Sequence, residues 1–377
     1  MKGKQGMVCM GLLLVLSSCH TGKQITASGL QRKDFQTEVN GQHTDLFTLS
    51  NKQGMEVCIT NYGARVVSIL VPDRNGKRED VVCGFSTITE YMEQRQNFGS
   101  TVGRYIGRIL NARFTLDGVE YKLVPNNGKS GHISHGGNPG FADRIWKVEQ
   151  ADTHRVRLSY LSPDGENGFP GNLKVTLVYS LGEDENALDL TYEATTDAPT
   201  VLNLSHHSFF NISGNFTKSV EDQQLWVDAD RFTPYDDKKC VTGEYLPVAG
   251  TPLDFRMPHA IGECIDADHP QLKVVNGYDH TWELNTKGDD TRPAVWVYDP
   301  ASGRKMEIFT TEPGMQIYTG NGLKGKMTGK RGIAYPFRSA VCFETMHFQD
   351  SPNQPGFPST VLRPGEVFRS HTVYKFE

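Results

Sequence analysis

The sequence predicts an all-β fold, a large antiparallel sandwich or barrel with few short helices. Apolar and polar residues alternate over many short stretches, whereas long runs with helical periodicity are scarce. Turn-forming residues separate these stretches, and the chain of 377 residues contains 38 glycines and 19 prolines. Short strands joined by frequent turns are typical of such antiparallel architectures.

The clearest predicted element is a strand pair within residues 173–195. Apolar residues occupy every second position of 173–181, and the alternation resumes over 188–195 after the polar turn 182–186. A period of two places one set of side chains on a buried face and the other set toward water. Because the connecting turn is short, the two stretches are expected to form an antiparallel hairpin.

Three further hairpins and one short helix are predicted. The dipeptide Asp117-Gly118, a strong hairpin signal, lies between 114–116 and 119–121. The remaining predicted elements are the pairs 57–59 with 64–71 and 295–298 with 306–309, and a helix within 86–94. No internal repeat or low-complexity segment follows residue 30, so residues 31–377 are expected to form one domain.

The first residues differ from the rest of the chain. Lys2 and Lys4 precede a short apolar run, and Cys19 follows that run. A helix that spans a bilayer needs roughly 20 residues, so residues 1–18 are interpreted as an export signal peptide. The sequence Leu16-Ser17-Ser18-Cys19 resembles a bacterial lipobox, which implies cleavage before Cys19 and a lipid on its thiol. A plain signal peptide with an incidental cysteine is the alternative.

A lipid on Cys19 implies that the protein is exported and anchored to a bacterial membrane, on the periplasmic side or at the cell surface. Residues 20–29 are small and polar, and residues 19–30 are expected to serve as a tether between the lipid and the domain.

Charge and cysteine content exclude other classes of function. The net charge of −5 argues against a nucleic-acid partner, which usually needs a basic face. No CxxC pair or Cys/His cluster suggests a zinc site, so no metal is predicted. The cysteines of the predicted domain are expected to be mostly small buried hydrophobes: Cys58, Cys83, Cys240, Cys264 and Cys342.

Polar and glycine-rich segments interrupt the strand pattern at six places, where functional residues usually lie. In chain order they are GRYIGRILNARF (103–114), SHGGNPGFADRIW (134–146), LNLSHHSFFN (202–211), NGYDHTWEL (276–284), TEPGMQIYTGN (311–321) and FETMHFQDSPN (343–353). In this order the segments resemble the aldose 1-epimerase (galactose mutarotase) family, from about residue 35 to residue 377. The resemblance implies a two-layered β-supersandwich. It also implies interconversion of the α and β anomers of free aldoses, of the glucose and galactose type, without a cofactor.

The resemblance also implies roles for individual residues. Glu344 matches the general base of the family and His207 its general acid. The side chains that match contacts to the sugar are Arg108, His135, Asp279 and Gln316, with His135 near the ring oxygen. Two positions depart from the family pattern, which commonly has asparagine where this chain has Gly107 and His206.

The chemistry of mutarotation needs this kind of pair. A proton leaves the anomeric hydroxyl while another reaches the ring oxygen, so a carboxylate and a protonated imidazole suffice. Each such group typically contributes ~10²–10⁴ in rate. An adjacent carboxylate is expected to raise the pKa of His207 and so to favour its acid form.

Strand periodicity predicts where these side chains point. In 340–345, a period of two places Glu344 on the face of Ala340 and Cys342, toward a cleft. Val341, Phe343 and Thr345 are then expected to face the core between the sheets. His206 and His207 point to opposite faces if their segment is extended, and His207 is expected to be the one in the cleft.

Two other functions fit the same residues. A glycoside hydrolase or lyase on a related sandwich would use Asp279 and Glu344 as a pair of carboxyl groups across the scissile bond. A sugar-binding lipoprotein would retain the pocket without turnover. Release of an aryl glycoside supports the first alternative, and sugar binding without faster mutarotation supports the second.

Overall fold

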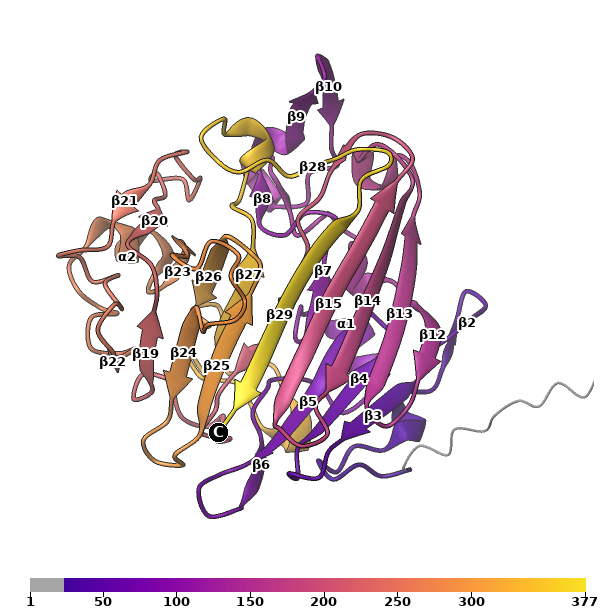
Figure 1. Ribbon diagram of the computed structural model, residues 1–377, viewed down its shortest axis with the longest axis vertical. Helices are drawn as coiled ribbons and strands as arrows, with labels where there is room; N and C mark the ends of the chain where they lie inside the picture. The colour runs from indigo at the N-terminus through magenta and orange to yellow at the C-terminus, as the bar shows by residue number, and fades with distance from the viewer. Residues whose placement is uncertain (1–23) are drawn as a thin grey trace, which may run out of the picture.

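The computed structural model describes residues 24–377, which form mainly antiparallel strands arranged in two layers (Figure 1). The predicted signal peptide 1–18, Cys19 and the start of the predicted tether lie outside the described residues. Within residues 24–377 there are two short α-helices, α1 (Ile88–Gln94) and α2 (Pro270–Val275). None of the described helices has the length and apolar character needed to cross a membrane.

One layer is a sheet of nine antiparallel strands, which lies toward the viewer in Figure 1. In spatial order its strands are β12 (Lys147–Ala151), β13 (Arg155–Ser162), β14 (Leu173–Leu181), β15 (Ala187–Thr196), β29 (Phe368–Phe376), β25 (Lys305–Thr310), β24 (Val295–Tyr298), β19 (Gln224–Val227) and β22 (His259–Ala260).

The other layer combines two sheets. The six-stranded sheet has the order β18 (Phe209–Phe210), β27 (Val341–Met346), β26 (Gly314–Tyr318), β23 (Asp279–Glu283), β20 (Arg231–Thr233) and β21 (Leu246–Pro247). The four-stranded sheet has the order β3 (Leu46–Ser50), β4 (Glu56–Thr60), β5 (Arg65–Pro72) and β6 (Arg78–Asp80). A bridge between Val82 and Phe210 joins the two sheets into one layer.

Short strand pairs surround this frame. They are β1 (Glu38–Val39) with β2 (Gln42–His43), β7 (Ser100–Val102) with β17 (Ser205–His207), β8 (Arg108–Ile109) with β11 (Ile133–Ser134), β9 (Arg113–Leu116) with β10 (Val119–Lys122), and β16 (Thr200–Val201) with β28 (Val361–Leu362). Two of these pairs, β7 with β17 and β8 with β11, carry side chains of the site described below.

The core lies between the two layers, where apolar side chains from all three large sheets form one cluster. Val341 and Phe343 of β27 belong to this cluster. On the same face, Thr345 Oγ1 lies 2.8 Å from Thr372 Oγ1 of β29. The predicted inward face of residues 340–345 is therefore confirmed, and Glu344 points away from the core.

The predicted hairpins are present. Strands β14 and β15 pair along their whole length, and β4 pairs with β5 and β24 with β25. The turn between β9 and β10 has positive φ at both Asp117 (50°) and Gly118 (80°), as a two-residue hairpin turn requires. The predicted helix within 86–94 begins at Ile88, where Thr87 and Glu90 form a capping box.

The described part of the predicted tether packs against the domain. Three of its side chains are buried, those of Thr26, Ser28 and Leu30. Glu56 Oε1 of β4 accepts hydrogen bonds from the backbone N–H of Ala27 (2.7 Å) and of Ser28 (3.2 Å). Arg331 donates to the carbonyl of Ser28 at 3.3 Å. The ordered domain therefore begins before residue 31.

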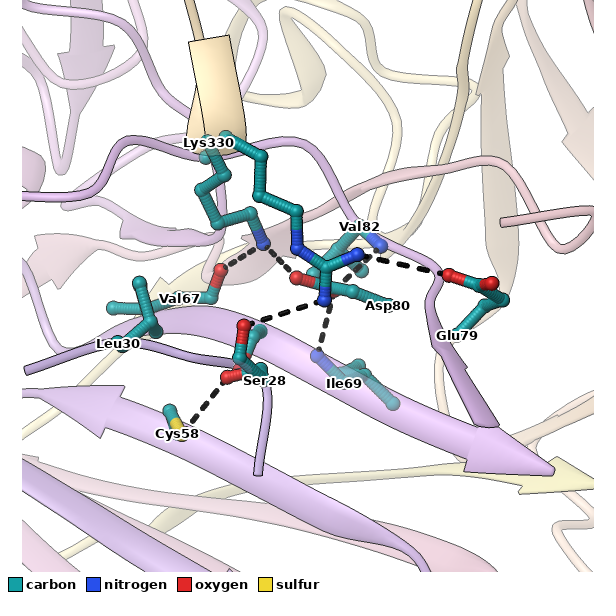
Figure 2. A network of polar contacts seen from close by, with 12 residues as sticks. Ser28, Leu30, Cys58, Val67, Ile69, Glu79, Asp80, Val82 and Lys330 are labelled. Carbon is teal, nitrogen blue, oxygen red and sulfur yellow. Dashed lines mark hydrogen bonds and ion pairs between the residues drawn. The ribbon is translucent and has the colours of Figure 1, made fainter. Parts of the chain in front are cut away.

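A buried ion pair lies beside this segment (Figure 2). Lys330 Nζ lies 2.5 Å from Asp80 Oδ2 and also donates to the carbonyl oxygen of Val67. The other oxygen of Asp80 accepts from the backbone N–H of Ile69 and of Val82. Because both charged groups are hydrogen-bonded to the four-stranded sheet in this way, the pair fixes the loop that carries Lys330 to that sheet.

The cysteines within residues 24–377 are all free thiols. Cys264 is partly exposed, whereas the other members of the set are buried: Cys58, Cys83, Cys240 and Cys342. The prediction that these cysteines are mostly buried is therefore confirmed.

Candidate active site

One cavity of about 250 Å³ is lined by all six side chains predicted to form the site: Arg108, His135, His207, Asp279, Gln316 and Glu344. These residues come from segments far apart in the sequence, and the fold brings them together on the face of β26 and β27 that points away from the core. The cavity is therefore the candidate active site.

The six-stranded sheet aligns part of the site by strand register. Glu344 of β27 lies directly opposite Gln316 of β26, and Gln316 lies opposite Thr281 of β23. Asp279 stands two positions before Thr281 and therefore shares its face. These side chains form a row fixed by backbone hydrogen bonds rather than by loops.

His207 faces Glu344 from outside this sheet. Pairing of β17 with β7 places His207 so that its Nε2 lies 3.4 Å from Glu344 Oε1. Both side chains are largely buried, with 7% and 5% of their surface exposed. The ring of Phe209 stacks on the imidazole with centroids 5.1 Å apart and so limits its rotation.

Burial controls the protonation of this pair. It raises the pKa of Glu344 well above its usual range, and the neighbouring charge of Asp279 adds to the rise. It lowers the pKa of His207 to about 4. The expectation of a raised pKa for His207 is therefore wrong, because loss of water disfavours the charged imidazole and the charge of Arg65 lowers the pKa further. Between these two pKa values the pair holds one proton in total.

Arg108 and His135 reach the cavity from the pair β8 and β11. Ser134 lies opposite Arg108 in the register, and His135 follows it with a positive φ of 52°. The ring centroids of His135 and His207 are 5.5 Å apart, with an angle of 72° between the rings. Burial, together with His207 and Arg108, lowers the pKa of His135 to about 3, so the ring is neutral.

Gln316 is hydrogen-bonded to two of its neighbours in this row of side chains, Asp279 and Thr281. Gln316 Nε2 donates to Asp279 Oδ1 at 2.7 Å, and Thr281 Oγ1 donates to Gln316 Oε1 at 2.5 Å. Burial raises the pKa of Asp279, whereas Arg108 and the hydrogen bond from Gln316 act in the opposite direction. The cavity thus presents an amide, a guanidinium, a neutral imidazole and two carboxyl groups, a set suited to sugar hydroxyls.

Comparison with known proteins identifies the family. A family model described as aldose 1-epimerase matches residues 45–375, which is most of the chain. The chain belongs to the aldose 1-epimerase family. Members of this family are isomerases.

Individual relatives in the aldose 1-epimerase family agree with this assignment. A galactose mutarotase of Bos taurus is 40% identical over 331 residues, which cover 88% of this chain and 93% of the relative. The aldose 1-epimerase of Escherichia coli (strain K12) is 36% identical over 340 residues, with coverage of 89% and 96%. The crystal structure of an aldose epimerase homologue from C. elegans superposes with a TM-score of 0.81 at 31% identity, covering 89% of this chain and 99% of that chain.

The two adjacent histidines of this aldose 1-epimerase family member point to opposite faces, as predicted. His206 does not line the cavity, and its Nε2 lies 2.7 Å from Ser208 Oγ. Its ring contacts Tyr179 and Tyr374 of the nine-stranded sheet, so it faces the core between the layers. Burial lowers the pKa of His206 to about 3, which keeps this core histidine uncharged.

Several cavity residues were not selected from the sequence: Gln96, Asn97, Gly107, Ser134, Phe209, Tyr318, Met346 and Gln349. Met346 shares the face of Glu344 by the period of two, so the strand pattern alone could have found it. Gln349 lies in a turn beyond the end of β27, where no periodicity applies. Only the folded chain brings Gln349 into the cavity.

One group of side chains offers possible metal ligands within the described residues. Ligand atoms of His207, Cys342 and Glu344 lie within 4.8 Å of one another. However, Cys342 Sγ lies 3.7 Å from Nδ1 of His207, whereas Glu344 faces Nε2. Burial also raises the pKa of Cys342 well above its usual range, so the thiol keeps its proton. This geometry suits proton transfer between Glu344 and His207 better than shared coordination of one ion.

Proposed function

We propose that this protein interconverts the α and β anomers of free aldoses by general acid–base catalysis. The observation that carries the proposal is the buried pair of Glu344 and His207, 3.4 Å apart in a cavity lined by further polar side chains. Membership of the aldose 1-epimerase family supports the same activity. Because several relatives are described as galactose mutarotases, we expect galactose to be a substrate, and the resemblance of the sequence segments to the family extends this expectation to glucose.

Glu344 takes the proton of the anomeric hydroxyl, and His207 gives a proton to the ring oxygen. The electrons of the O–H bond form the aldehyde C=O, and those of the C1–O5 bond pass to the ring oxygen. Rotation of the aldehyde and the reverse transfers then close the ring on the other face. The net change on ring opening is one proton moved from O1 to O5, so the enzyme needs no external donor.

The single proton of the pair is compatible with this scheme. A neutral pair and an ion pair have the same net charge, so burial disfavours gain or loss of a proton more than transfer within the pair. The distance of 3.4 Å between His207 Nε2 and Glu344 Oε1 is short enough to become a hydrogen bond on a small movement. The reactive form, with ionised Glu344 and protonated His207, is therefore reached without exchange with solvent.

The remaining side chains hold the sugar in this scheme. Arg108 and Gln316 donate hydrogen bonds to hydroxyls, Asp279 accepts them, and neutral His135 stands beside His207 near the ring oxygen. The Nδ1 of His135 is buried and has no hydrogen-bond partner within residues 24–377.

Polarimetry tests the proposal. Fresh α-galactose or α-glucose is mixed with residues 24–377 in buffer with a chelator, and the decay of optical rotation is expected to be faster than without protein. Release of an aryl glycoside at a higher rate than mutarotation would instead favour a hydrolase that uses Asp279 and Glu344. Sugar binding without any acceleration would support a binding protein.

We also propose that the protein is exported and lipid-anchored through Cys19 to a bacterial membrane, facing the periplasm or the cell surface. The basic start, the short apolar run and the sequence Leu16-Ser17-Ser18-Cys19 support this proposal. Expression of the full chain and of Cys19→Ala, followed by membrane fractionation, tests it. The variant is expected in the soluble fraction, and equal membrane retention of both proteins would reject the anchor.

A further inference from the structure

Gln349 lines the cavity but has no role in the proton transfers proposed above. It lies in the turn after β27, and only 4% of its surface is exposed. Its side chain stands between Arg108 and Gln316, two groups that are proposed to bind sugar hydroxyls. A buried amide in this place needs partners for its oxygen and its nitrogen.

Both ends of the Gln349 amide are satisfied by residues of the site. Its Oε1 accepts from the backbone N–H of Arg108 (3.3 Å) and from Arg108 Nη1 (3.4 Å). Its Nε2 donates to Gln316 Oε1 at 3.3 Å and to Tyr235 Oη at 2.7 Å. Gln316 in turn donates to Asp279. We call the series Arg108–Gln349–Gln316–Asp279 the amide chain.

The amide chain has a fixed direction. A guanidinium can only donate hydrogen bonds, so the Gln349 oxygen must face Arg108 and its nitrogen must face Gln316. The Gln316 oxygen then accepts from Gln349 and Thr281, and its nitrogen faces Asp279. Removal of the Gln349 amide would take away the acceptor that holds the Arg108 guanidinium and one of the hydrogen bonds that hold Gln316. The chain therefore determines which donors and acceptors meet the sugar.

Gly107 provides the space that Gln349 occupies. A Cβ atom at position 107 would lie 2.5 Å from Cγ of Gln349 and 3.0 Å from its Cδ, closer than unbonded carbons approach. Gly107 also has a φ of +75°, which most side chains adopt only with strain. Gly107 and Gln349 are therefore mutually dependent: a side chain at 107 displaces the amide at 349.

We propose that Gln349 is a positioning residue for sugar binding, acting through Arg108 and Gln316, and that Gly107 is required to admit it. This inference rests on the proposed function, because it assigns Arg108, Gln316 and Asp279 to the sugar hydroxyls. Interactions of this kind hold the substrate and the transition state alike. Their loss is expected to raise KM and to leave kcat nearly unchanged.

The main test is Gln349→Met, which keeps the length of the side chain and removes both hydrogen-bonding ends. We expect KM for galactose to rise about tenfold, with kcat within about twofold of the wild type and an unchanged pH profile. A matched control is Gln223→Met, because Gln223 is also buried but does not line the cavity. The control is expected to change thermal stability without changing KM.

A second test uses the dependence of Gly107 and Gln349 on each other. Asparagine tolerates positive φ better than most residues, so Gly107→Asn is expected to weaken galactose binding mainly by displacing Gln349. In a Gln349→Ala background the atoms beyond Cβ that a side chain at 107 would meet are absent, and the effect of the same change on KM is expected to be about twofold or less. Equal effects of Gly107→Asn in both backgrounds would reject the mutual dependence.

The outcomes separate this inference from the proposed function. An unchanged KM in Gln349→Met, or a large loss of kcat alone, overturns the positioning role while wild-type activity stands. If the wild type binds galactose in a calorimeter without accelerating mutarotation, the proposed reaction fails. Weaker galactose binding by Gln349→Met in that calorimeter would then still support the positioning role. Absence of any galactose or glucose binding by the wild type rejects both.

Discussion

The carboxylate of Glu344 lies 3.4 Å from the imidazole of His207, although the two residues stand on strands of different sheets. Both side chains are largely buried, and loss of water favours the uncharged form of each. The same two groups therefore hold one proton over a broad range of pH. This property has a direct consequence for activity.

The pH profile of kcat/KM is expected to be bell-shaped, with an acid limb near pH 4. Below this pH His207 is protonated while Glu344 keeps its own proton. The pair then holds two protons, and no base remains. The alkaline limb is expected well above the usual carboxylate range, where Glu344 loses the last proton. Polarimetry from about pH 3 to about pH 10 measures both limbs. An alkaline limb near the ordinary carboxylate pKa contradicts the shared proton.

Replacement of Glu344 by glutamine is expected to lower kcat by ~10²–10⁴, because the amide cannot accept the anomeric proton. Galactose binding is expected to persist, since the neutral amide has nearly the same shape. Polarimetry measures the loss of kcat, and calorimetry measures galactose binding. Glu193→Gln on β15 is a matched control, because that carboxylate is half-exposed and pairs with Arg369. Equal activity of Glu344→Gln and the wild type would show that another group is the base.

Lys330→Met is expected to destabilise the fold by ~3–5 kcal/mol, since Asp80 is left buried without its cation. Unfolding in urea, followed by far-UV circular dichroism, measures the change in the free energy of unfolding. Lys326→Met is the control, because Lys326 is exposed on the same loop. That change is expected to stay within about 0.5 kcal/mol of zero. A similarly small effect of Lys330→Met would mean that the buried ion pair contributes little net stability.

His371 provides a pH-dependent contribution to stability. It lies between Asp189 and Asp290, each 2.6 Å away, and the hydrogen bond to Asp189 is the main cause that raises its pKa to about 9. The pKa of the unfolded chain is about 6.5, so the contribution is complete below that pH and is lost as the pH rises through about 9. With solvent screening we expect about 1–2 kcal/mol.

Unfolding of the wild type and of His371→Gln at a series of pH values measures this contribution. The difference in the free energy of unfolding is expected to be largest below about pH 6.5 and to shrink as the pH passes about 9. A difference that stays constant over this range would assign the effect to packing rather than to charge.

The alternation of apolar and polar residues was sufficient to predict the all-β architecture and the face of β27 on which each side chain lies. Period two correctly separated Phe343, in the core, from Glu344, in the cavity, because strand geometry is local. It could not give the pKa of His207, which depends on burial by segments distant in the sequence. The place of Gln349 in the cavity could not be predicted for a related reason. A turn residue belongs to no strand periodicity, and its partners at 108, 235 and 316 come together only in the folded chain.

The N-terminal boundary of the domain could not be predicted from the local sequence either. The small polar composition of 20–29 suggested a tether over 19–30, yet Ser28 and Leu30 are buried against the four-stranded sheet. Composition does not reveal that Glu56 holds the backbone of this segment. The structural domain is therefore longer than the alternating pattern indicated.

Thr281, Gln316 and Glu344 are aligned across three strands, so their positions are fixed by strand register. Residues on the connecting segments are not fixed in this way. A slip of one residue in β26 or β27 would turn Gln316 or Glu344 into the interior, so the position of the proposed base is tied to the folding of the whole layer. Gln349 and His135 stand on connecting segments, free of that constraint. Under the proposed function, substitutions at Gln349 or His135 are therefore expected to change sugar binding without moving Glu344.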